Sequence, residues 1–245
     1  MSGLVDAIRA FSTNSSPLDF WLVFQNWGLF WTGLQNTLIL LVVSLTVGGV
    51  IAVPLAIVRA TRAPVLNPLA YGFIYLIRGT PLLVQLYIIY YGLGQFEAVR
   101  NSPAWMVLKD PWWCALIAFS ISTSAYTAEI FRAAIVDTPR GEVEAAIAAG
   151  MSGGLAMRRI ILPSAFRRAL LAYGNEVIFN LQTTTLASTV TVIDVLGAAR
   201  LLNNNYYLAA EGFLTAAVIY IAIVLIITRI FRALERRFFR HLQQS

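Results

Sequence analysis

Charged side chains stand inside apolar stretches of this chain, where a physical reason is needed to keep them. An unpaired charge at membrane depth is costly, so such a residue pairs, contacts a ligand or faces a path. Glu129 has Arg132 three positions later, which predicts a local ion pair; ligand contact is the alternative. Glu176 has no basic residue within four positions, so we expect it to face a cavity or a neighbouring helix. Asn175 adjoins it, and Thr183 lies two turns further on nearly the same face, where hydroxyls bind ligands or neighbouring helices.

Two more charged residues have a structural interpretation first. Arg78 precedes Gly79 and Pro81, so it either caps the inner end of a broken helix or holds a buried acid. Contact with a ligand is a second interpretation of Arg78. Asp194, near the end of an apolar segment, is expected to serve a helix end or an interface and not a ligand.

The composition excludes several other kinds of chemistry. One cysteine, Cys114, and one histidine, His241, cannot build a disulfide framework or an all-protein zinc site. The single lysine, Lys109, is not part of a Gly-Lys-Ser/Thr element, so the chain has no P-loop with which to hydrolyse ATP. No HExxH motif or serine-histidine pair lies in the apolar stretches, so an intramembrane enzyme is not expected. The net charge of +6 is spread along the chain, which does not predict a nucleic-acid-binding face.

The elements that must hold these residues are membrane helices. Hydrophobic residues make up 58% of the chain and charged residues 12%, which is about half the charged share of a soluble domain. A helix needs about 20 residues to cross roughly 30 Å of hydrocarbon. Five segments meet that length, the second being interrupted near Arg78: about 34–58, 69–93, 111–130, 169–198 and 212–228. We therefore expect an all-α, polytopic membrane protein with about five transmembrane helices in one domain, 1–245.

A polar stretch separates the third and fourth segments and predicts a helix-turn-helix knob in water. Thr138 and Pro139 predict the N-cap and the first residue of a short helix, and Gly150 predicts its end. The glycine pair 153–154 predicts a turn, and a second helix should run from about 155 to 163. One face of the first helix has small residues that would let another surface approach closely; it comprises Val143, Ala146, Ile147 and Gly150.

Basic residues near the segment ends predict the orientation, because Lys and Arg accumulate on the cytoplasmic side. If the polar knob is cytoplasmic, thirteen arginines share its side: Arg59, Arg62, Arg132, Arg140, Arg158, Arg159, Arg167, Arg168, Arg229, Arg232, Arg236, Arg237 and Arg240. The opposite side holds only Arg9, Arg100, Lys109 and Arg200. We expect the N-terminal segment, about 1–33, to be outside and the tail, 229–245, to be cytoplasmic.

Four blocks give the chain a resemblance to a known family. They are YLIRGTPLLVQL at 75–86, AYTAEIF at 125–131, the pattern EAA-x3-G-x9-I-x-LP at 144–163, and YGNEVI at 173–178. From about residue 34 to the tail, the chain resembles permease subunits of the polar amino-acid branch of ABC importers. Within that branch it is similar to the M-type subunits of histidine/basic amino-acid and octopine or nopaline importers. The resemblance implies a type I ABC importer transmembrane domain in a bacterial inner membrane.

The resemblance also implies a division of labour. This chain would lie in the membrane lipid and form the path for a polar and basic amino acid or an opine. It would then not itself be an enzyme. Two copies of an ATPase subunit, which use ATP and Mg²⁺, would bind the EAA loop at about 135–166. A second permease subunit, different or identical, would complete the path, and a periplasmic binding protein would deliver the ligand. No cofactor, metal or nucleic acid is expected on this chain.

Site residues follow from the same resemblance. The expected coupling residues are Glu144, Ala145, Ala146, Gly150, Ile160, Leu162 and Pro163. Carboxylates on the substrate path would satisfy the ammonium group of an amino acid. The candidates for that path are Arg78, Glu129, Asn175, Glu176 and Thr183.

A secondary carrier or channel is the alternative. Such a protein would also be apolar, sparsely charged and basic on its inner side, and it would work without an ATPase. It would not require a capped polar knob with the EAA spacing.

Overall fold

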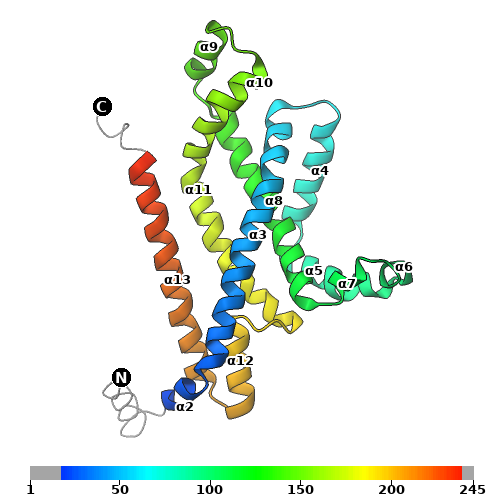
Figure 1. Cartoon of the computed structure of the whole chain (residues 1–245), viewed down its shortest axis with the longest axis vertical. Coiled ribbons are helices and arrows are strands. Elements are labelled where there is room, and N and C mark those ends of the chain that lie inside the picture. Colours follow the sequence, from blue (N-terminus) through cyan, green and yellow to red (C-terminus); the bar gives the residue numbers. More distant parts are fainter. Residues whose placement is uncertain (1–17, 239–245) are drawn as a thin grey trace.

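The computed structural model describes residues 18–238, which form helices and no strand within that range (Figure 1). A short helix, α2 (Phe20–Gln25), is capped by the Asp19 carboxylate and leads into the long helix α3 (Trp27–Thr61). Together with α8 (Pro111–Val136) and α13 (Ala209–Phe238), α3 is long and apolar enough to cross a membrane without interruption. These helices agree with the first, third and fifth predicted segments. The prediction of an all-α polytopic protein is confirmed for the described residues.

The second predicted segment is broken where the sequence indicated. Helix α4 (Leu66–Gly79) ends before an extended Thr80-Pro81 pair, and α5 (Leu82–Tyr87) starts on the other side. The two halves are bent by 100°, so the second half does not continue in the direction of the first. The Gln85 amide donates to the backbone oxygens of Ile77 (2.7 Å) and Thr80 (3.0 Å), which stabilises the bend by satisfying carbonyls at the helix end.

An arm projects sideways from this bend (Figure 1). It continues α5 through a π-helical turn, Ile88–Gly92, and a 3₁₀ turn, Leu93–Gln95. Two one-turn helices, α6 (Glu97–Arg100) and α7 (Trp105–Leu108), then return the chain to α8. The Asp110 carboxylate accepts from the Trp112 amide at 2.9 Å, and Pro111 occupies the first turn of α8. These are ordinary start signals for a helix.

The fourth predicted segment is also broken. Helix α11 (Leu162–Thr183) passes into a 3₁₀ segment (Thr184–Val190), and α12 (Val195–Tyr206) follows at an angle of 41°. Asp194 is fully buried and caps α12, since its Oδ1 accepts from the Gly197 amide at 2.8 Å. Its Oδ2 accepts from the Tyr220 hydroxyl at 3.0 Å, which ties α12 to α13. The prediction that Asp194 serves a helix end is confirmed.

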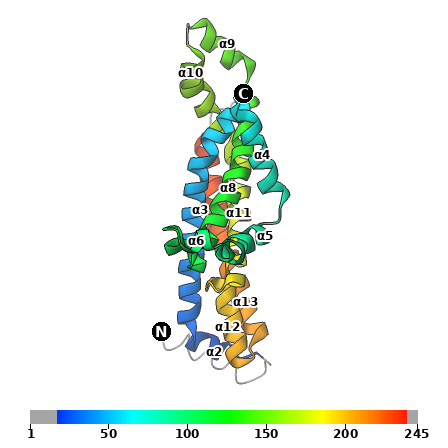
Figure 2. The same cartoon turned by 90° about the vertical axis from the view of Figure 1, so that its right-hand side faces the viewer.

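Helices α3 and α8 lie against each other along much of their length and form the centre of the bundle (Figure 2). Gly48 makes this approach possible, because a Cβ there would lie 2.8 Å from the Thr123 side chain and 2.9 Å from the Ser120 carbonyl oxygen. Asn180 of α11 joins the same place: its amide donates to Thr123 Oγ1 and its Oδ1 accepts from Ser44 Oγ at 3.2 Å. All three side chains are buried. A polar junction therefore links α3, α8 and α11.

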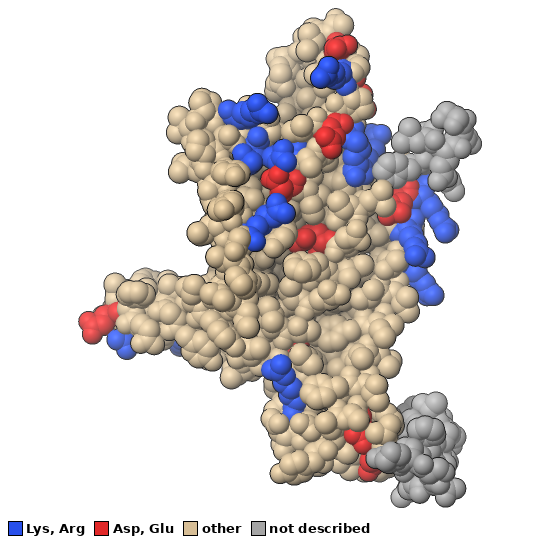
Figure 3. Space-filling model, turned by 180° about the vertical axis from the view of Figure 1, so that it is seen from behind, with Lys and Arg blue, Asp and Glu red and all other residues tan. Residues whose placement is uncertain are grey.

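The molecule has two distinct ends. The knob formed by α9 (Arg140–Ala148) and α10 (Gly153–Ala156) lies at one end, and α2 and α12 lie at the other (Figures 1 and 2). Figure 3 shows most of the arginines on the half of the molecule that carries the knob. Arg9, Arg240 and His241 lie outside the described residues.

Candidate functional site

The knob begins one residue later than the sequence predicts. Pro139 occupies the cap position of α9, and the helix starts at Arg140. Thr138 does not cap α9: its hydroxyl is buried and donates to the Ile135 carbonyl oxygen at 2.7 Å. The predicted cap was wrong because the end of α8 takes this hydroxyl.

The end of α9 is as predicted. Gly150 has a φ of 74°, and its amide donates to the Ile147 carbonyl oxygen at 2.9 Å. The Met151 amide donates to the Ala146 carbonyl oxygen at 3.1 Å, which completes a Schellman motif. The glycine pair behaves differently from the prediction. Gly153 and its neighbour open α10 after a Ser152 cap, so the turn precedes them.

The second helix of the knob does not end at Pro163. A π-helical segment (Met157–Ile161) follows α10 and passes directly into α11, which has Pro163 in its first turn. The knob is thus continuous with a long membrane helix on its C-terminal side.

The exposed face of α9 differs from the expected one. Ala146 is only 3% exposed, because this side of α9 packs on α10 and the π-helical segment that follows it. Glu144, Ala145 and Ala148 are exposed, and Ile147 is 65% exposed. A partner surface would therefore meet Glu144, Ala145 and Ile147, while Ala146 holds the hairpin closed.

The root of the knob packs on α8. Leu162 and Ile161 contact a core that includes Phe131, Ala134 and Ile135 of α8. Ile160 is half-buried, and Pro163 is exposed. Arg168 of α11 also reaches this root, where its guanidinium donates to the Thr138 hydroxyl at 2.7 Å.

A polar cavity of about 370 Å³ opens between α3, α4 and α8 on the knob half of the bundle. Its wall includes Arg59, Tyr71, Arg78, Tyr126 and Glu129. A second cavity of about 400 Å³ shares the last three of these residues and extends to Asp137 and Arg168. Cationic, acidic and phenolic groups thus line two neighbouring cavities, and the second of them reaches Arg168 at the root of the knob.

The predicted pair of Glu129 and Arg132 is present. Nε and Nη2 of Arg132 lie 2.6 Å and 2.5 Å from Glu129 Oε1. The guanidinium of Arg78 lies over the Tyr126 ring at 5.1 Å from its centre, at the C-terminal end of α4, where a cation is favourable. Arg59 stacks similarly on Tyr71, at 4.7 Å.

The remaining candidates do not come together. Glu176 is buried, with 8% exposure, and makes no hydrogen bond or ion pair within 4 Å in the described chain; the charge of Arg78 reaches it across a longer distance. Asn175 is exposed on a different side of α11. The Thr183 hydroxyl donates to the Asn180 carbonyl oxygen at 2.8 Å, within its own helix. None of these three residues lines the two polar cavities.

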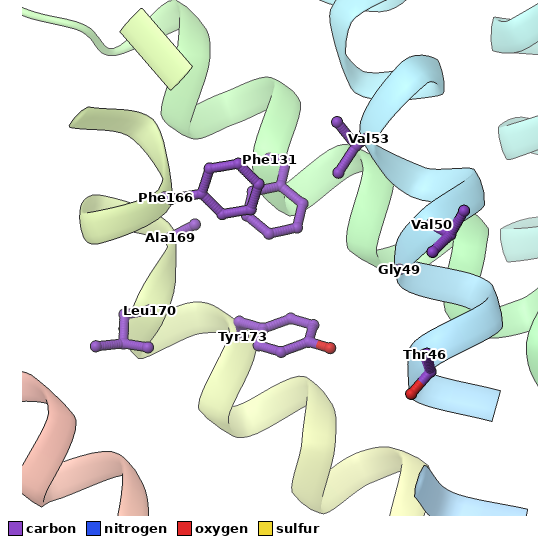
Figure 4. A pocket seen from close by; sticks show the side chains of 9 residues that line it. All are labelled: Thr46, Gly49, Val50, Val53, Phe131, Phe166, Ala169, Leu170 and Tyr173. Carbon is purple, nitrogen blue, oxygen red and sulfur yellow. The ribbon is translucent and has the colours of Figure 1, made fainter. Parts of the chain in front are cut away.

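An apolar cavity of about 490 Å³ lies between α3 and α11 (Figure 4). The rings of Phe131 and Phe166 meet there with centres 4.6 Å apart. Tyr173 points from α11 toward α3, and its hydroxyl and that of Thr46 are the polar side-chain groups in the wall. Without a charged group, this cavity does not suit a charged ligand.

Sequence reasoning missed Asn180. Its amide connects three helices. In the sequence, Asn180 is a polar residue within an apolar run, which is also the pattern expected of a residue on a substrate path. Its position four residues after Glu176 was the available signal.

A bundle of apolar helices, with a helical knob outside it at the arginine-rich end, defines a polytopic membrane protein. The chain belongs to the family of binding-protein-dependent transport system inner membrane components, whose model matches residues 48–240. This confirms the family predicted from the EAA loop and its neighbouring blocks.

Named relatives agree with this assignment. The nopaline transport system permease protein NocM of Agrobacterium fabrum is 41% identical over 214 residues, 87% of this chain and 89% of the relative. The histidine/lysine/arginine/ornithine transport system permease protein HisM of Salmonella typhimurium is 42% identical over 219 residues, 89% of this chain and 93% of the relative.

Solved structures confirm the fold. An amino acid ABC transporter crystallised with histidines has a chain that is 32% identical and superposes with a TM-score of 0.80, covering 91% of this chain and all of its own. A chain of the MetNI methionine ABC transporter, 18% identical with a TM-score of 0.72, shares the fold over 91% of this chain and 99% of its own. The type I importer fold implied by the sequence blocks is confirmed. A secondary carrier or channel is not favoured.

Proposed function

We propose that this chain is the membrane subunit of an ATP-driven importer for a polar and basic amino acid or an opine. The observation that carries the proposal is the exposed EAA helix α9, held outside the bundle by the Gly150 turn and the packed root. Relatives named for the transport of nopaline and of histidine, lysine, arginine and ornithine support the substrate class.

Coupling residues lie on and beneath the knob. Glu144, Ala145 and Gly150 form its exposed part, and an ATPase subunit docks there. Ala146 closes the hairpin, while Ile160, Leu162 and Pro163 join it to α11. The chain has no P-loop, so two ATPase copies bind ATP and Mg²⁺ in its place, and this chain binds no cofactor.

The topology follows from the charge distribution. The knob loop, 135–166, and the end of α13 with the tail, 229–245, carry eight of the seventeen arginines and face the cytoplasm. The N-terminal segment, 1–33, and α12 face outward, toward a periplasmic binding protein. The whole chain, 1–245, is one domain in the inner membrane, and a second, different permease subunit completes the path through the lipid.

The substrate path passes the polar cavities. Arg78 offers a guanidinium to a substrate carboxylate, and Glu129 offers a carboxylate to an ammonium or a guanidinium. Glu176, which no cation pairs with directly in the described chain, is a second acid for the same role. Asn175 and Thr183 reach the path when the helices move between inward-facing and outward-facing states.

Affinity purification tests the assembly. The tagged chain is solubilised gently from its native membrane, and co-purifying proteins are identified by mass spectrometry. We expect a P-loop ATPase and a second EAA-bearing permease. Recovery of the chain alone, in a form that moves solute into liposomes without ATP, would mean that it is a self-sufficient carrier.

A charge reversal tests the docking face. Glu144→Lys should abolish ATP-driven uptake while leaving membrane insertion intact. Glu97→Lys is the matched control, because Glu97 is also an exposed acid and lies on the sideways arm, away from the knob. Undiminished uptake by the Glu144 variant would remove the docking claim.

Neutralising Glu176 tests its place on the path. Glu176→Gln should reduce the substrate-stimulated ATPase activity of the complex, and Glu97→Gln should not. Unchanged stimulation in the Glu176 variant would count against a substrate contact.

A further inference from the structure

Arg168 forms hydrogen bonds with both α8 and the linker at the root of the knob. It lies on α11, and its Nη2 donates to the Ala134 carbonyl oxygen at 3.0 Å. That carbonyl belongs to the last turn of α8, where the Thr138 amide bonds to Ile135 instead of Ala134. Arg168 therefore satisfies a helix-end carbonyl that the helix leaves without an amide, and its positive charge is favourable at a C-terminus.

The same nitrogen also holds the linker that enters the knob. Nη2 lies 2.7 Å from Thr138 Oγ1, and that hydroxyl donates its own proton to the Ile135 carbonyl oxygen at 2.7 Å. Thr138 is buried and lies two residues before α9 starts. A chain of two hydrogen bonds thus runs from α11 through the linker into α8.

The ion pair with the knob itself is the weaker contact. Nη1 of Arg168 lies 4.0 Å from Glu142 Oε1, and the two side chains are 27% and 39% exposed. Exposed ion pairs of this kind contribute little to stability. Nη1 also donates to Ser164 Oγ at 2.6 Å, within α11. The hydrogen bonds to Ala134 and Thr138 are therefore the ones that join separate elements.

Apolar contacts of Ile161 and Leu162 with α8 pack the root, and the hydrogen bonds of Arg168 add a polar link to it. Helix α8 enters the knob through the short linker 137–139, and the knob leaves through α10 and the π-helical segment into α11. Arg168 bridges these two legs at their base, and it also lines the cavity shared by Arg78 and Glu129. One guanidinium thus touches both the base of the knob and the wall of the polar region.

We propose that Arg168 is a positioning residue that fixes the two legs of the knob to each other, so that displacement of the knob moves α8 and α11 as one body. This rests on the proposed coupling function of the knob. Without the guanidinium, the linker would pivot and a push on α9 would be lost before it reached the cavity.

Distance measurements test the joint without any substrate or ATPase. Spin labels are placed at exposed Ala148 on the knob and exposed Thr61 at the end of α3, in full-length chain with the buried Cys114 replaced by alanine. We expect Arg168→Met to broaden the distance distribution. Arg167→Met is the control, because Arg167 is an exposed neighbour that forms no hydrogen bond or ion pair with α8 or the linker in the described chain. Equal widths in both variants and the parent would overturn the proposal.

A gentler variant guards against misfolding. Thr138→Val removes the hydroxyl that accepts from Arg168 and keeps the side-chain shape. It should broaden the distribution in the same direction but less, while Glu142→Gln should leave it nearly unchanged. Broadening by Glu142→Gln alone would mean that the ion pair, and not the Thr138 bridge, forms the joint.

Coupled transport is the second measurement. In proteoliposomes with partner subunits, import is measured alongside ATP hydrolysis for whichever of arginine, histidine, nopaline or octopine the unmutated complex imports. Loss of hydrogen bonds to a charged group should lower import per ATP about tenfold in Arg168→Met. Arg168→Lys should recover part of it, and Arg167→Met should stay within about twofold of the parent. Loss of import and hydrolysis in equal proportion by Arg168→Met would argue for a merely structural role.

The two proposals fail differently. If the unmutated complex imports solute without ATP, the coupling function is wrong, yet the label distances still report whether Arg168 holds the knob. If ATP-driven import is intact in the parent and in Arg168→Met, only the role of Arg168 is wrong.

Discussion

Asn180 joins three helices through its side-chain amide, so replacing Asn180 should measurably lower the stability of the bundle. Asn180→Leu removes the amide that links the Ser44 and Thr123 hydroxyls, although the Ser44 hydroxyl can still donate to the Leu41 carbonyl oxygen. We expect the free energy of unfolding to fall by about 1–2 kcal/mol, because each polar contact between membrane helices contributes only modestly to stability. Thermal unfolding in detergent measures it. Asn175→Leu is the matched control on an exposed side of the same helix, and an equal loss there would contradict the role of Asn180.

The sequence predicted single residues well where the cause is local. Glu129 and Arg132 are one helical turn apart, so their ion pair depends only on neighbours along the chain. Gly150 has a φ of 74°, which glycine adopts at little cost, so the end of α9 is also decided locally. Thr138 and Ala146 were misjudged because their surroundings come from elsewhere. The Thr138 hydroxyl bonds α8 and Arg168, and Ala146 packs on the other leg of the knob.

At the scale of elements, the contact between α3 and α8 depends on Gly48. Adding a methyl group there would place it 2.8 Å from Thr123, so Gly48→Ala should separate the helices and destabilise the bundle by about 1–3 kcal/mol. Gly49→Ala meets nothing within 4 Å and should be neutral or stabilising, because alanine favours a helix by up to about 1 kcal/mol. Unfolding midpoints of the two variants should therefore shift in opposite directions. A shift of the same sign and size in both would contradict this contact.

Hydropathy located the three uninterrupted spans and the two bent helix pairs, but not the shape of the bent pairs. The Pro81 break was readable, because proline removes an amide and restricts the residue before it. The 100° direction of the bend was not, since it depends on Gln85 bonding back to Ile77 and Thr80. The 3₁₀ segment Thr184–Val190 was likewise not predictable, because its sequence TTLASTV has no proline, glycine or charged residue that would mark a departure from a regular helix.

At the scale of the molecule, the two ends should lie on opposite sides of the membrane. Single cysteines are placed at Ala148 on the knob and at Tyr207, which is 90% exposed at the other end, with Cys114 replaced by alanine. A membrane-impermeant thiol reagent should label the Tyr207 variant in intact spheroplasts and the Ala148 variant only after permeabilisation. The arginine distribution is the physical reason. The reverse pattern would invert the proposed topology.

The π-helical segment Met157–Ile161 changes which residues before and after it lie on the same face of the helix. A π turn holds about one residue more than an α turn, and one residue corresponds to about 100° of rotation. A mutational scan across 153–183 that assumes one uninterrupted period will thus assign the far part of α11 to the wrong side. Deleting one residue within 157–161 would restore the regular period and swing the knob about the axis of α11, so that Glu144 faces a new direction.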